Sequence, residues 1–351
     1  MAIPSEKPYL IAELGVNFYD TARVENITPM QAAKKYVDAA AQAGASAAKF
    51  QYYKANKIVS KNSPAYWDLT KEPTATQYDL FKKHDGFNAE DYQELAAYCK
   101  EKGIDFLCTP FDYDAADQLD PLVPYFKISS SDASNLPFLR YVAEKGKPIF
   151  LSVGACYESE IDEAVRTILD AGCPRLVLLH CVLSYPTKFE DANLNMITRM
   201  QTMYPDLEIG YSDHTMPDPS MMVLSMAYML GATVIEKHFT LDTSLPGNDH
   251  YHAGLPEDFA RAVANFEMIR KIHGTHTHRV VLDAEKESRK QARRSLVLSR
   301  DIKAGEVIQA RDLVAKRPGT GIAPQFADIL VGKTLREDLP EDTVLTWDEL
   351  I

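Results

Sequence analysis

The stretch GYSDHT at residues 210–215 and the stretch VIEKHFT at residues 234–240 together decide the fold. Each reads as a short apolar strand that finishes in polar residues, and a helix-like segment joins the two. Two strands joined by a helix of this length form a βαβ unit, in which the strands are parallel and neighbouring. Their carboxyl ends therefore lie on the same face of a sheet.

A histidine stands near the end of each of these strands. His214 follows Asp213 directly, and His238 comes two residues after Glu236. Two imidazoles with nearby acids at one end of a sheet are suitable ligands for a divalent metal, so we expect a metal site here. The alternative is that both histidines are core or surface residues without a ligand role.

The same alternation of strand-like and helix-like runs extends over most of the chain. The strand runs are nearly continuous hydrophobics, which is typical of a parallel sheet covered on both faces. About eight βα units predict a (β/α)₈ TIM barrel at residues 1–279. A doubly wound open sheet is the alternative, but no GxGxxG opens the first βα turn. The expected strands lie at residues 9–15, 46–51, 105–110, 125–130, 148–154, 176–182, 210–215 and 234–240.

Helix-like spacing separates these strands, and one connection is unusually long. Residues 52–88 are polar and too long for a simple βα turn, so we interpret them as a functional loop or lid. The expected helices lie at residues 30–43, 89–102, 135–145, 158–171, 192–204 and 256–273.

The tail of the chain changes character. Residues 280–294 are charged and are interpreted as a linker, and residues 295–351 show short β runs without a long helical period. We expect a separate small β-rich domain there. A domain of this size buries little core and often depends on a partner.

Composition narrows the class of protein. The formal net charge of −12 argues against a nucleic-acid partner, which requires a basic face. The cysteines show no CxxC pair, the first residues show no signal-peptide pattern, and no apolar run approaches the length of a membrane span. We expect a soluble, cytoplasmic protein with buried free thiols and no membrane partner.

Polar residues gather at the expected carboxyl ends of the barrel strands, where the active sites of such barrels lie. Lys49 and Lys127 with several hydroxyls form a pocket suited to an anion, best a phosphate. A lysine within a barrel strand has the alternative of an ion-paired structural side chain. The collected residues are Glu13, Asn17, Lys49, Gln51, Thr109, Lys127, Ser129, Ser130, Ser152, His180, Tyr185, Ser212, Asp213, His214, Glu236 and His238.

The motifs of the chain, taken in order, resemble those of the sialic acid synthase family. These phosphoenolpyruvate-dependent enzymes make N-acetylneuraminic, legionaminic and pseudaminic acids. The tail, with RDIKAGEVI and KRPGTGI, is similar to the antifreeze-like (SAF) domain of that family. The matching motifs are IAELGVN at 11–17, AGASAAKFQ at 43–51, CTPFD at 108–112, KISSSD at 127–132, LSVGA at 151–155, LLHC at 178–181, SYP at 184–186, GYSDHT at 210–215, EKHFTLD at 236–242, PGNDH at 246–250, RDIKAGEVI at 300–308 and KRPGTGI at 316–322.

The resemblance implies a condensation of phosphoenolpyruvate with an open-chain N-acetylated amino sugar and water, with release of phosphate by C–O cleavage. It implies that His214 and His238 bind Mn²⁺ (or Mg²⁺), which polarises the aldehyde oxygen. It implies that Glu13 is a catalytic residue, the acidic side chain near the metal and the reacting water. The implied substrate-binding residues are Lys49, Gln51, Thr109, Lys127, Ser130, Ser152, Tyr185, Ser212, Asp249 and Arg317.

Three of these residues point to particular partners. Tyr185 and Asp249 match sugar-binding positions, and Arg317 matches an arginine that the SAF domain inserts into the active site of the partner subunit. The resemblance therefore implies a domain-swapped homodimer.

The chain departs from the family pattern where sugar would be contacted, so the acceptor stays open. Phe18 stands where many relatives have histidine, and residues 182–184, 21–30 and 250–254 also differ from the usual pattern. In the last of these, His250 and His252 are interpreted as part of an exposed polar loop rather than as ligands. The acceptor can be N-acetylmannosamine, its 6-phosphate or a 2,4-diacetamido-trideoxy sugar. Another phosphoenolpyruvate-dependent 3-deoxy-sugar-acid synthase and a non-catalytic carbohydrate-binding protein are the alternative functions.

Overall fold

The structure is a computed structural model that describes residues 6–247 and 249–351. The chain divides between Gly274 and Thr275 into two compact units, each with its own hydrophobic core. The expected end of the barrel domain at residue 279 and the expected end of the linker at residue 294 remain predictions. No helix among the described residues is both long enough and apolar enough to span a membrane.

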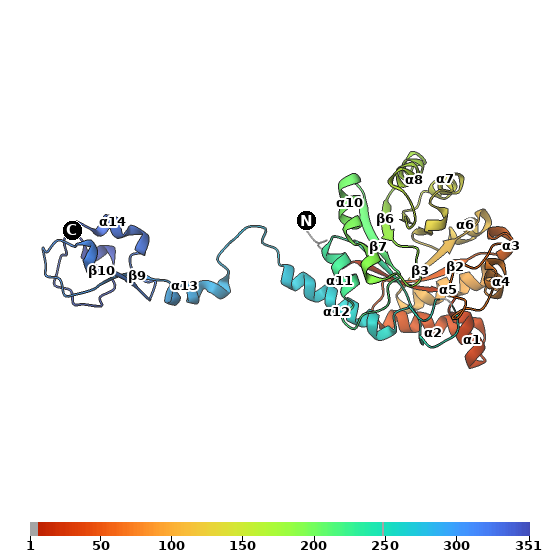
Figure 1. The fold of residues 1–351 in the computed structure, drawn as a ribbon, viewed down its shortest axis with the longest axis horizontal. Helices are drawn as coiled ribbons and strands as arrows, with labels where there is room; N and C mark the ends of the chain where they lie inside the picture. The colour runs from red at the N-terminus through yellow and green to blue at the C-terminus, as the bar shows by residue number, and fades with distance from the viewer. Residues whose placement is uncertain (1–5, 248) are drawn as a thin grey trace. The chain divides into compact units, whose positions relative to one another are not determined.

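The described part of the first unit is built on eight parallel strands, which Figure 1 shows at its centre with helices around them. Hydrogen bonding follows the order β3-β2-β1-β8-β7-β6-β5-β4, and β3 and β4 at the two ends of this order contact each other. The predicted (β/α)₈ barrel is thereby confirmed. The strands are β1 (Tyr9–Gly15), β2 (Ala47–Tyr52), β3 (Asp105–Pro110), β4 (Phe126–Ile128), β5 (Ile149–Ser152), β6 (Leu176–Cys181), β7 (Glu208–Asp213) and β8 (Val234–His238).

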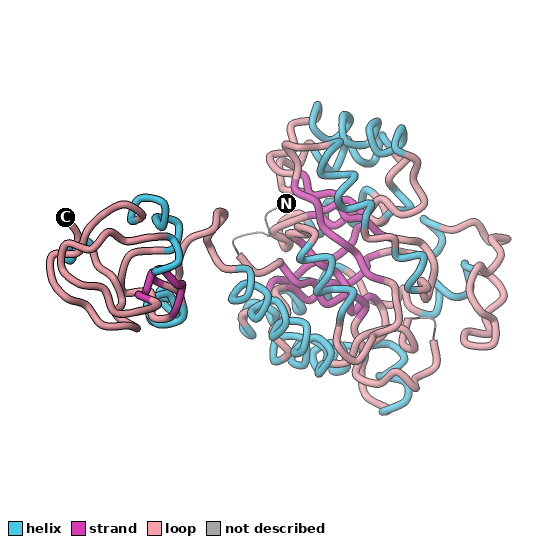
Figure 2. The backbone as a smooth tube through the Cα atoms, turned by 60° about the vertical axis from the view of Figure 1, so that its left-hand side comes forward, coloured by secondary structure: helices cyan, strands magenta, loops and turns pink. Residues whose placement is uncertain are grey.

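Helices surround the strands, as Figure 2 shows in cyan around magenta. The helices α1 and α6 were not expected from the sequence. Residues 52–88, interpreted as a loop or lid, contain α3, α4 and a bridge between Pro64 and Thr76. The helices are α1 (Phe18–Glu25), α2 (Pro29–Gln42), α3 (Ala55–Ile58), α4 (Gln77–Lys83), α5 (Ala89–Lys102), α6 (Tyr113–Leu119), α7 (Leu136–Ala143), α8 (Glu158–Asp170), α9 (Phe189–Ala192), α10 (Asn195–Met203), α11 (Met222–Met229) and α12 (Pro256–His273).

The strands are buried on both faces, and successive residues point to opposite sides. In β1, Leu10 and Ala12 belong to the large core between strands and helices, whereas Ile11 belongs to a separate apolar cluster. That cluster draws on strands around the barrel, so it fills the barrel interior. Its buried members are Ile11, Ala47, Leu107, Phe150, Val177, Leu179 and Val234.

Gly210 continues this interior packing at the third residue of β7. A Cβ atom at this position would lie 2.4 Å from Leu179 Cδ2 and 2.5 Å from the Val234 carbonyl oxygen. The interior therefore has no room for a side chain here, which explains why the stretch that decides the fold begins with glycine.

The second unit has the small β-rich core expected for the tail. The strand β9 (Ser295–Leu298) pairs antiparallel with β10 (Leu313–Lys316), and isolated bridges extend the pairing. The region expected to be a linker contains a short helix, α13. The remaining elements are η2 (Asp283–Glu285), α13 (Lys286–Ala292), η3 (Ala310–Asp312), η4 (Pro324–Phe326), α14 (Ala327–Leu330) and η5 (Trp347–Glu349).

Candidate active site

A polar layer lies directly above the apolar cluster inside the barrel. Glu13 comes two residues after Ile11, and Lys49 comes two residues after Ala47, so each points to the same side as its apolar predecessor. The polar layer lines a pocket at the carboxyl ends of the strands, where barrel enzymes carry their active sites. Its members are Glu13, Lys49, Thr109, Lys127, Ser152, Ser212 and Glu236.

Strand register brings the charged residues of this layer together. Glu13 pairs in register with Lys49 on one side and with His238 on the other. The Lys49 ammonium contacts the Glu13 carboxylate and lies 3.7 Å from Glu236 Oε2. The Lys127 ammonium lies 3.6 Å from Glu236 Oε1. Two buried lysines are thus balanced by two buried carboxylates.

Burial and pairing move the pKa values of these groups in different directions. Burial raises the pKa of the Glu13 carboxyl in spite of Lys49. Burial also lowers the pKa of Lys127, and the carboxylate of Glu236 does not fully offset that. For Lys49 the neighbouring carboxylates outweigh burial and raise the pKa, and for Glu236 the two lysines outweigh burial and lower it. Of the two carboxyl groups, Glu13 is the one that can exchange a proton near neutral pH.

Hydroxyl groups complete the lysine side of the pocket. Lys49 Nζ donates to Thr109 Oγ1 at 3.2 Å, and Lys127 Nζ donates to Ser152 Oγ at 2.7 Å. Ser130 accepts from the Gly154 amide at 2.9 Å and also lines the pocket. Ammonium and hydroxyl groups that converge in one buried pocket are donors for a phosphate or carboxylate.

Histidines form the opposite side of the pocket. His214 Nδ1 lies 2.7 Å from the carbonyl oxygen of Val182, which places its proton on Nδ1 and leaves Nε2 as an acceptor. The rings of His214 and His238 are 5.4 Å apart, and the Tyr185 ring lies 4.3 Å from His214. Burial lowers the pKa of both histidines, so they are neutral at neutral pH, which is the form that binds metal.

These residues fit a divalent metal ion. One imidazole is oriented by a backbone carbonyl, as is common for metal-ligating histidine. The Nδ1 atom of His238 is buried without a hydrogen-bond partner among the described residues. Asp249 Oδ2 lies 3.8 Å from this nitrogen.

Of the two acids that are near the histidines in sequence, Glu236 lines the pocket with them and Asp213 does not. Asp213 points to the other side of its strand from His214 and forms a fully buried ion pair with Lys237, at 2.5 Å from Nζ to Oδ2. Glu236 lines the pocket but lies against the lysines. Strand alternation explains the position of Asp213, since neighbours in sequence face opposite sides.

The prediction that His250 and His252 lie in an exposed polar loop was wrong. Both side chains are fully buried. His250 Nδ1 lies 2.7 Å from Thr240 Oγ1, and the His252 ring lies 4.9 Å from the His238 ring. Burial lowers the pKa of His252 to about 3. The short run HYHAG at residues 250–254 shows no clear periodicity, so the sequence gave no sign that the fold covers this turn.

The structure places the remaining predicted residues as follows. Gln51 donates to Glu13 Oε1 at 2.7 Å, and both Gln51 and Ser212 line the pocket. Tyr185 lies beside the histidines, and Asp249 lies at the edge of His238. Arg317 is exposed on the second unit, directly after β10.

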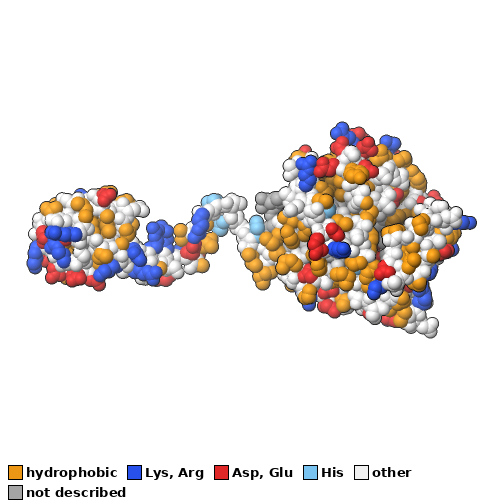
Figure 3. All heavy atoms as spheres, in the orientation of Figure 1, with side chains coloured by type: hydrophobic (Ala, Val, Ile, Leu, Met, Phe, Trp, Pro, Cys, Tyr) orange, Lys and Arg blue, Asp and Glu red, His pale blue; other side chains and the backbone are white. Residues whose placement is uncertain are grey.

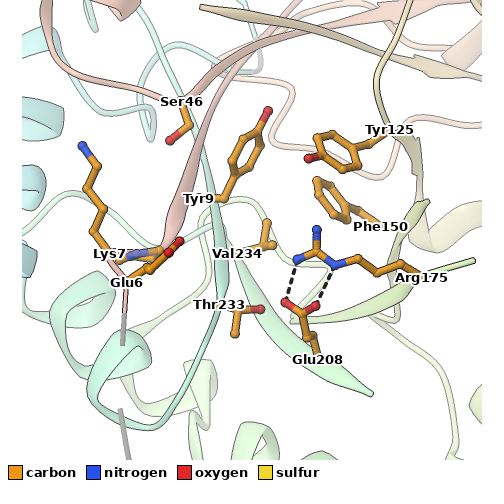
Figure 4. A pocket seen from close by; sticks show the side chains of 11 residues that line it. Glu6, Lys7, Tyr9, Ser46, Tyr125, Phe150, Arg175, Glu208, Thr233 and Val234 are labelled. Carbon is orange, nitrogen blue, oxygen red and sulfur yellow. Dashed lines mark hydrogen bonds and ion pairs between the residues drawn. The ribbon is translucent and has the colours of Figure 1, made fainter. Parts of the chain in front are cut away.

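The larger hollow of the first unit lies at the opposite end of the barrel. Figure 4 shows its lining, with the Arg175 and Glu208 side chains joined by two hydrogen bonds of 2.6 and 2.7 Å. Its volume is about 470 Å³, and it is lined by residues at the amino ends of the strands, such as Tyr9 and Val234. Residues at this end of a barrel usually serve stability rather than catalysis.

The fold and the pocket define the class of protein. A (β/α)₈ barrel carries, at the carboxyl ends of its strands, one pocket that joins an anion-binding side to a neutral histidine side. This is the arrangement of a barrel enzyme that acts on an anionic substrate, with a small β-rich domain attached in sequence.

Comparison with known proteins gives the particular family. The NeuB family profile matches residues 36–278, and the SAF domain profile matches residues 293–351. The chain therefore belongs to the NeuB family of sialic acid synthases and carries a SAF domain at its carboxyl end, so it is an enzyme.

Named relatives agree with this family. The chain is 36% identical to an N,N'-diacetyllegionaminic acid synthase of Legionella pneumophila, covering 97% of this chain and 94% of the relative. It is also 36% identical to an uncharacterised protein of Methanocaldococcus jannaschii, covering 99% and 95% of the two chains. The crystal structure of an N-acetylneuraminic acid synthetase from Leptospira borgpetersenii in complex with citrate has a TM-score of 0.68 and 32% identity, covering 82% of this chain and 92% of that one.

Proposed function

We propose that this enzyme condenses phosphoenolpyruvate with an open-chain N-acetylated amino sugar and water, and releases phosphate by C–O cleavage. The observation that carries the proposal is the single pocket whose lysines and histidines face each other across the barrel mouth. Family membership and the names of the relatives support the same reaction.

The lysine side of the pocket suits phosphoenolpyruvate. Lys49 and Lys127 with the hydroxyls of Thr109, Ser130 and Ser152 offer charge-assisted donors to its phosphate and carboxylate. Ser212, which donates to Glu236 at 3.1 Å, also lines this side. An incoming trianion replaces the Glu13 carboxylate as the partner of Lys49, and this leaves the carboxylate free to act as a base.

The histidine side suits the sugar aldehyde. His214 and His238 would hold the Mn²⁺ (or Mg²⁺) of the proposal. Bound there, the ion would supply Lewis-acid polarisation of the aldehyde oxygen. The enolpyruvyl C3 then attacks the aldehyde C1, water adds at C2, and the C–O bond to phosphate breaks. Glu13, between Lys49 and His238 in register, is suitably placed to take the proton from that water.

The sugar and the second subunit complete the proposal. We assign Tyr185 and Asp249 to the sugar, since both lie beside His238. We assign Arg317 to the active site of a partner subunit, because the arginine is exposed and its motif matches the family. This arrangement requires a homodimer. The cytoplasmic location expected from the cysteines belongs to the same proposal.

An exposed apolar face supports a homodimer. Figure 3 shows hydrophobic side chains gathered over the part of the barrel where Figure 1 labels α11 and α12. A surface of this kind commonly marks a protein interface. The exposed side chains on these two neighbouring helices are Met222, Met226, Met229, Met268 and Ile272.

The test is phosphate release from phosphoenolpyruvate with a panel of aldoses. The panel contains N-acetylmannosamine, its 6-phosphate and a 2,4-diacetamido-trideoxy sugar, with erythrose 4-phosphate and arabinose 5-phosphate as acceptors of the rival class. Release with an N-acetylated sugar only is the expected result. Release with the non-acetylated phosphosugars would favour a 3-deoxy-sugar-acid synthase, and no release with any acceptor would favour a binding protein.

A further inference from the structure

His252 has an unusual environment for a polar side chain. It is fully buried, and neither of its ring nitrogens has a hydrogen-bond partner among the described residues. Buried polar atoms are almost always paired with protein, water or an ion. A neutral imidazole with two unpaired nitrogens therefore indicates a bound partner at this position.

The turn that carries His252 is held in place on both sides. The Gly254 amide donates to the His238 carbonyl oxygen at 2.8 Å, and the Tyr251 hydroxyl donates to the Tyr185 carbonyl oxygen at 2.8 Å. Between these anchors the His252 ring is fixed beside His238, with ring centroids 4.9 Å apart. Fixed donors bind a ligand without a large ordering cost.

Three potential metal ligands meet at this point. His238, Asp249 and His252 each offer a ligand atom, and these atoms all lie within 4.8 Å of one another. Bonds of about 2.0–2.2 Å allow two donors on one ion to be at most about 4.4 Å apart. The 3.8 Å between His238 Nδ1 and Asp249 Oδ2 already satisfies that limit. Small side-chain movements therefore suffice to bring all three ligand atoms within bonding distance of one ion.

We propose that His252 and Asp249 join His238 as ligands of a divalent first-row transition-metal ion. Two imidazoles and one carboxylate match the donor set that binds Mn²⁺, Fe²⁺, Co²⁺ or Zn²⁺. Mg²⁺ prefers oxygen ligands and waters, so it binds this set weakly. The inference rests on the proposed function and deepens it, because it adds protein ligands beyond the two histidines assigned there and moves Asp249 from the sugar to the metal.

The test measures binding of the metal alone, so its outcome does not depend on turnover of any substrate. The full-length chain is freed of metal with a chelator and titrated with Co²⁺, Mn²⁺ and Mg²⁺ by calorimetry, and the Co²⁺ spectrum reports imidazole ligation. His276 and His278 are exposed and could bind metal on their own. All variants are therefore made in a His276→Ala/His278→Ala background.

We expect one tight transition-metal ion per chain and much weaker binding of Mg²⁺. His252→Phe keeps the shape of the ring, removes its nitrogens, and should lower Co²⁺ and Mn²⁺ affinity at least about tenfold. The control is His180→Phe. His180, collected above with the site residues, does not line the pocket; it is buried in β6 and its Nε2 lies 2.9 Å from the Ala192 carbonyl oxygen, so the variant should keep full affinity. If His252→Phe does not fold, His252→Gln replaces it in the same measurement.

Unchanged affinity in the His252 variant would overturn the inference and leave a buried water as the partner of His252. Loss of affinity in His214→Ala together with full affinity in the His252 variant would overturn it in favour of a site with two histidines only. Mg²⁺ binding as tight as that of Mn²⁺ would also contradict it. If the metal result holds but no phosphoenolpyruvate is consumed, the proposed function alone fails.

Discussion

Replacement of Lys237 by methionine should destabilise the barrel unit strongly. Lys237 and Asp213 are each 1% exposed, and their charged atoms lie 2.5 Å apart. Lys237 also donates to the Thr215 carbonyl at 2.8 Å, and the Tyr211 hydroxyl donates to Asp213 at 2.9 Å. The methionine side chain is unbranched like that of lysine and one atom shorter, but it leaves the Asp213 carboxylate buried without its counter-charge.

The size of the effect follows from this burial. Removing one partner of a buried ion pair costs about 3–5 kcal/mol of unfolding free energy. An unfolding entropy of about 2.1 cal/mol/K per residue gives about 0.58 kcal/mol/K for a unit that ends at residue 274. The expected fall in the melting temperature of the barrel is therefore about 5–9 °C.

The assay is thermal unfolding followed by circular dichroism and calorimetry, with Mn²⁺ binding as a second readout. His214 and His238 directly follow Asp213 and Lys237 in sequence, so Lys237→Met should also weaken Mn²⁺ binding. Adding Asp213→Asn removes the uncompensated charge and should recover part of the lost stability. Lys35→Met is the control.

Lys35 pairs with Glu25 on the surface of the same unit, where the side chains are 50% and 40% exposed. Removing that pair should cost less than about 1 kcal/mol, or less than about 2 °C. Equal melting temperatures for Lys237→Met and Lys35→Met, with unchanged metal affinity, would refute the reasoning.

Three further predictions concern the site and its surroundings. Lys49→Ala and Lys127→Ala should each raise the Michaelis constant for phosphoenolpyruvate by about one to two orders of magnitude and leave metal affinity nearly unchanged, as steady-state kinetics and calorimetry would show. Arg317→Ala and His214→Ala, each inactive alone, should regain activity when mixed under subunit exchange, because one site of a swapped dimer then carries neither defect; mixed dimers without activity would contradict this. His84 and His250, whose Nε2 atoms lie 3.6 and 3.5 Å from the Asp20 carboxylate, outweigh burial and lower the pKa of Asp20, so its stabilisation is present above the unfolded pKa of about 3.9 and is lost as the pH falls further. Asp20→Asn should therefore lower the free energy of unfolding by about 1–3 kcal/mol at pH 7, as measured by denaturant unfolding. If the difference in unfolding free energy between the variant and wild type does not narrow below pH 4, the assignment is wrong.

The barrel was predictable from the sequence because the apolar runs of its strands and the helical spacing between them are both clear. Continuous apolar runs such as residues 176–182 marked buried parallel strands, and glycines marked the ends of several helices. The alternation within strands also carries the site, since Glu13 and Lys49 follow interior residues at a spacing of two. The short helices α1 and α6 were missed because they show too few turns for a clear helical period.

Tertiary contacts decided what the sequence could not show. Nothing local to His252 reveals that a turn anchored on Tyr185 and on the end of β8 buries it. Nothing local to Asp213 reveals that its partner is Lys237, because that pairing depends on the register of β7 with β8. Similarly, the charges of Lys49 and Lys127 were evident, but the two carboxylates that balance them appear only when the barrel closes.

The most direct test of the proposed reaction follows one oxygen atom. Phosphoenolpyruvate labelled with ¹⁸O in the bridging C–O–P position is incubated with the Mn²⁺-loaded enzyme and the best acceptor of the aldose panel. Phosphorus NMR then locates the label. C–O cleavage predicts that the released phosphate carries the ¹⁸O and that product forms in equal amount. Phosphate without label, with the ¹⁸O retained in the organic product, would contradict the account.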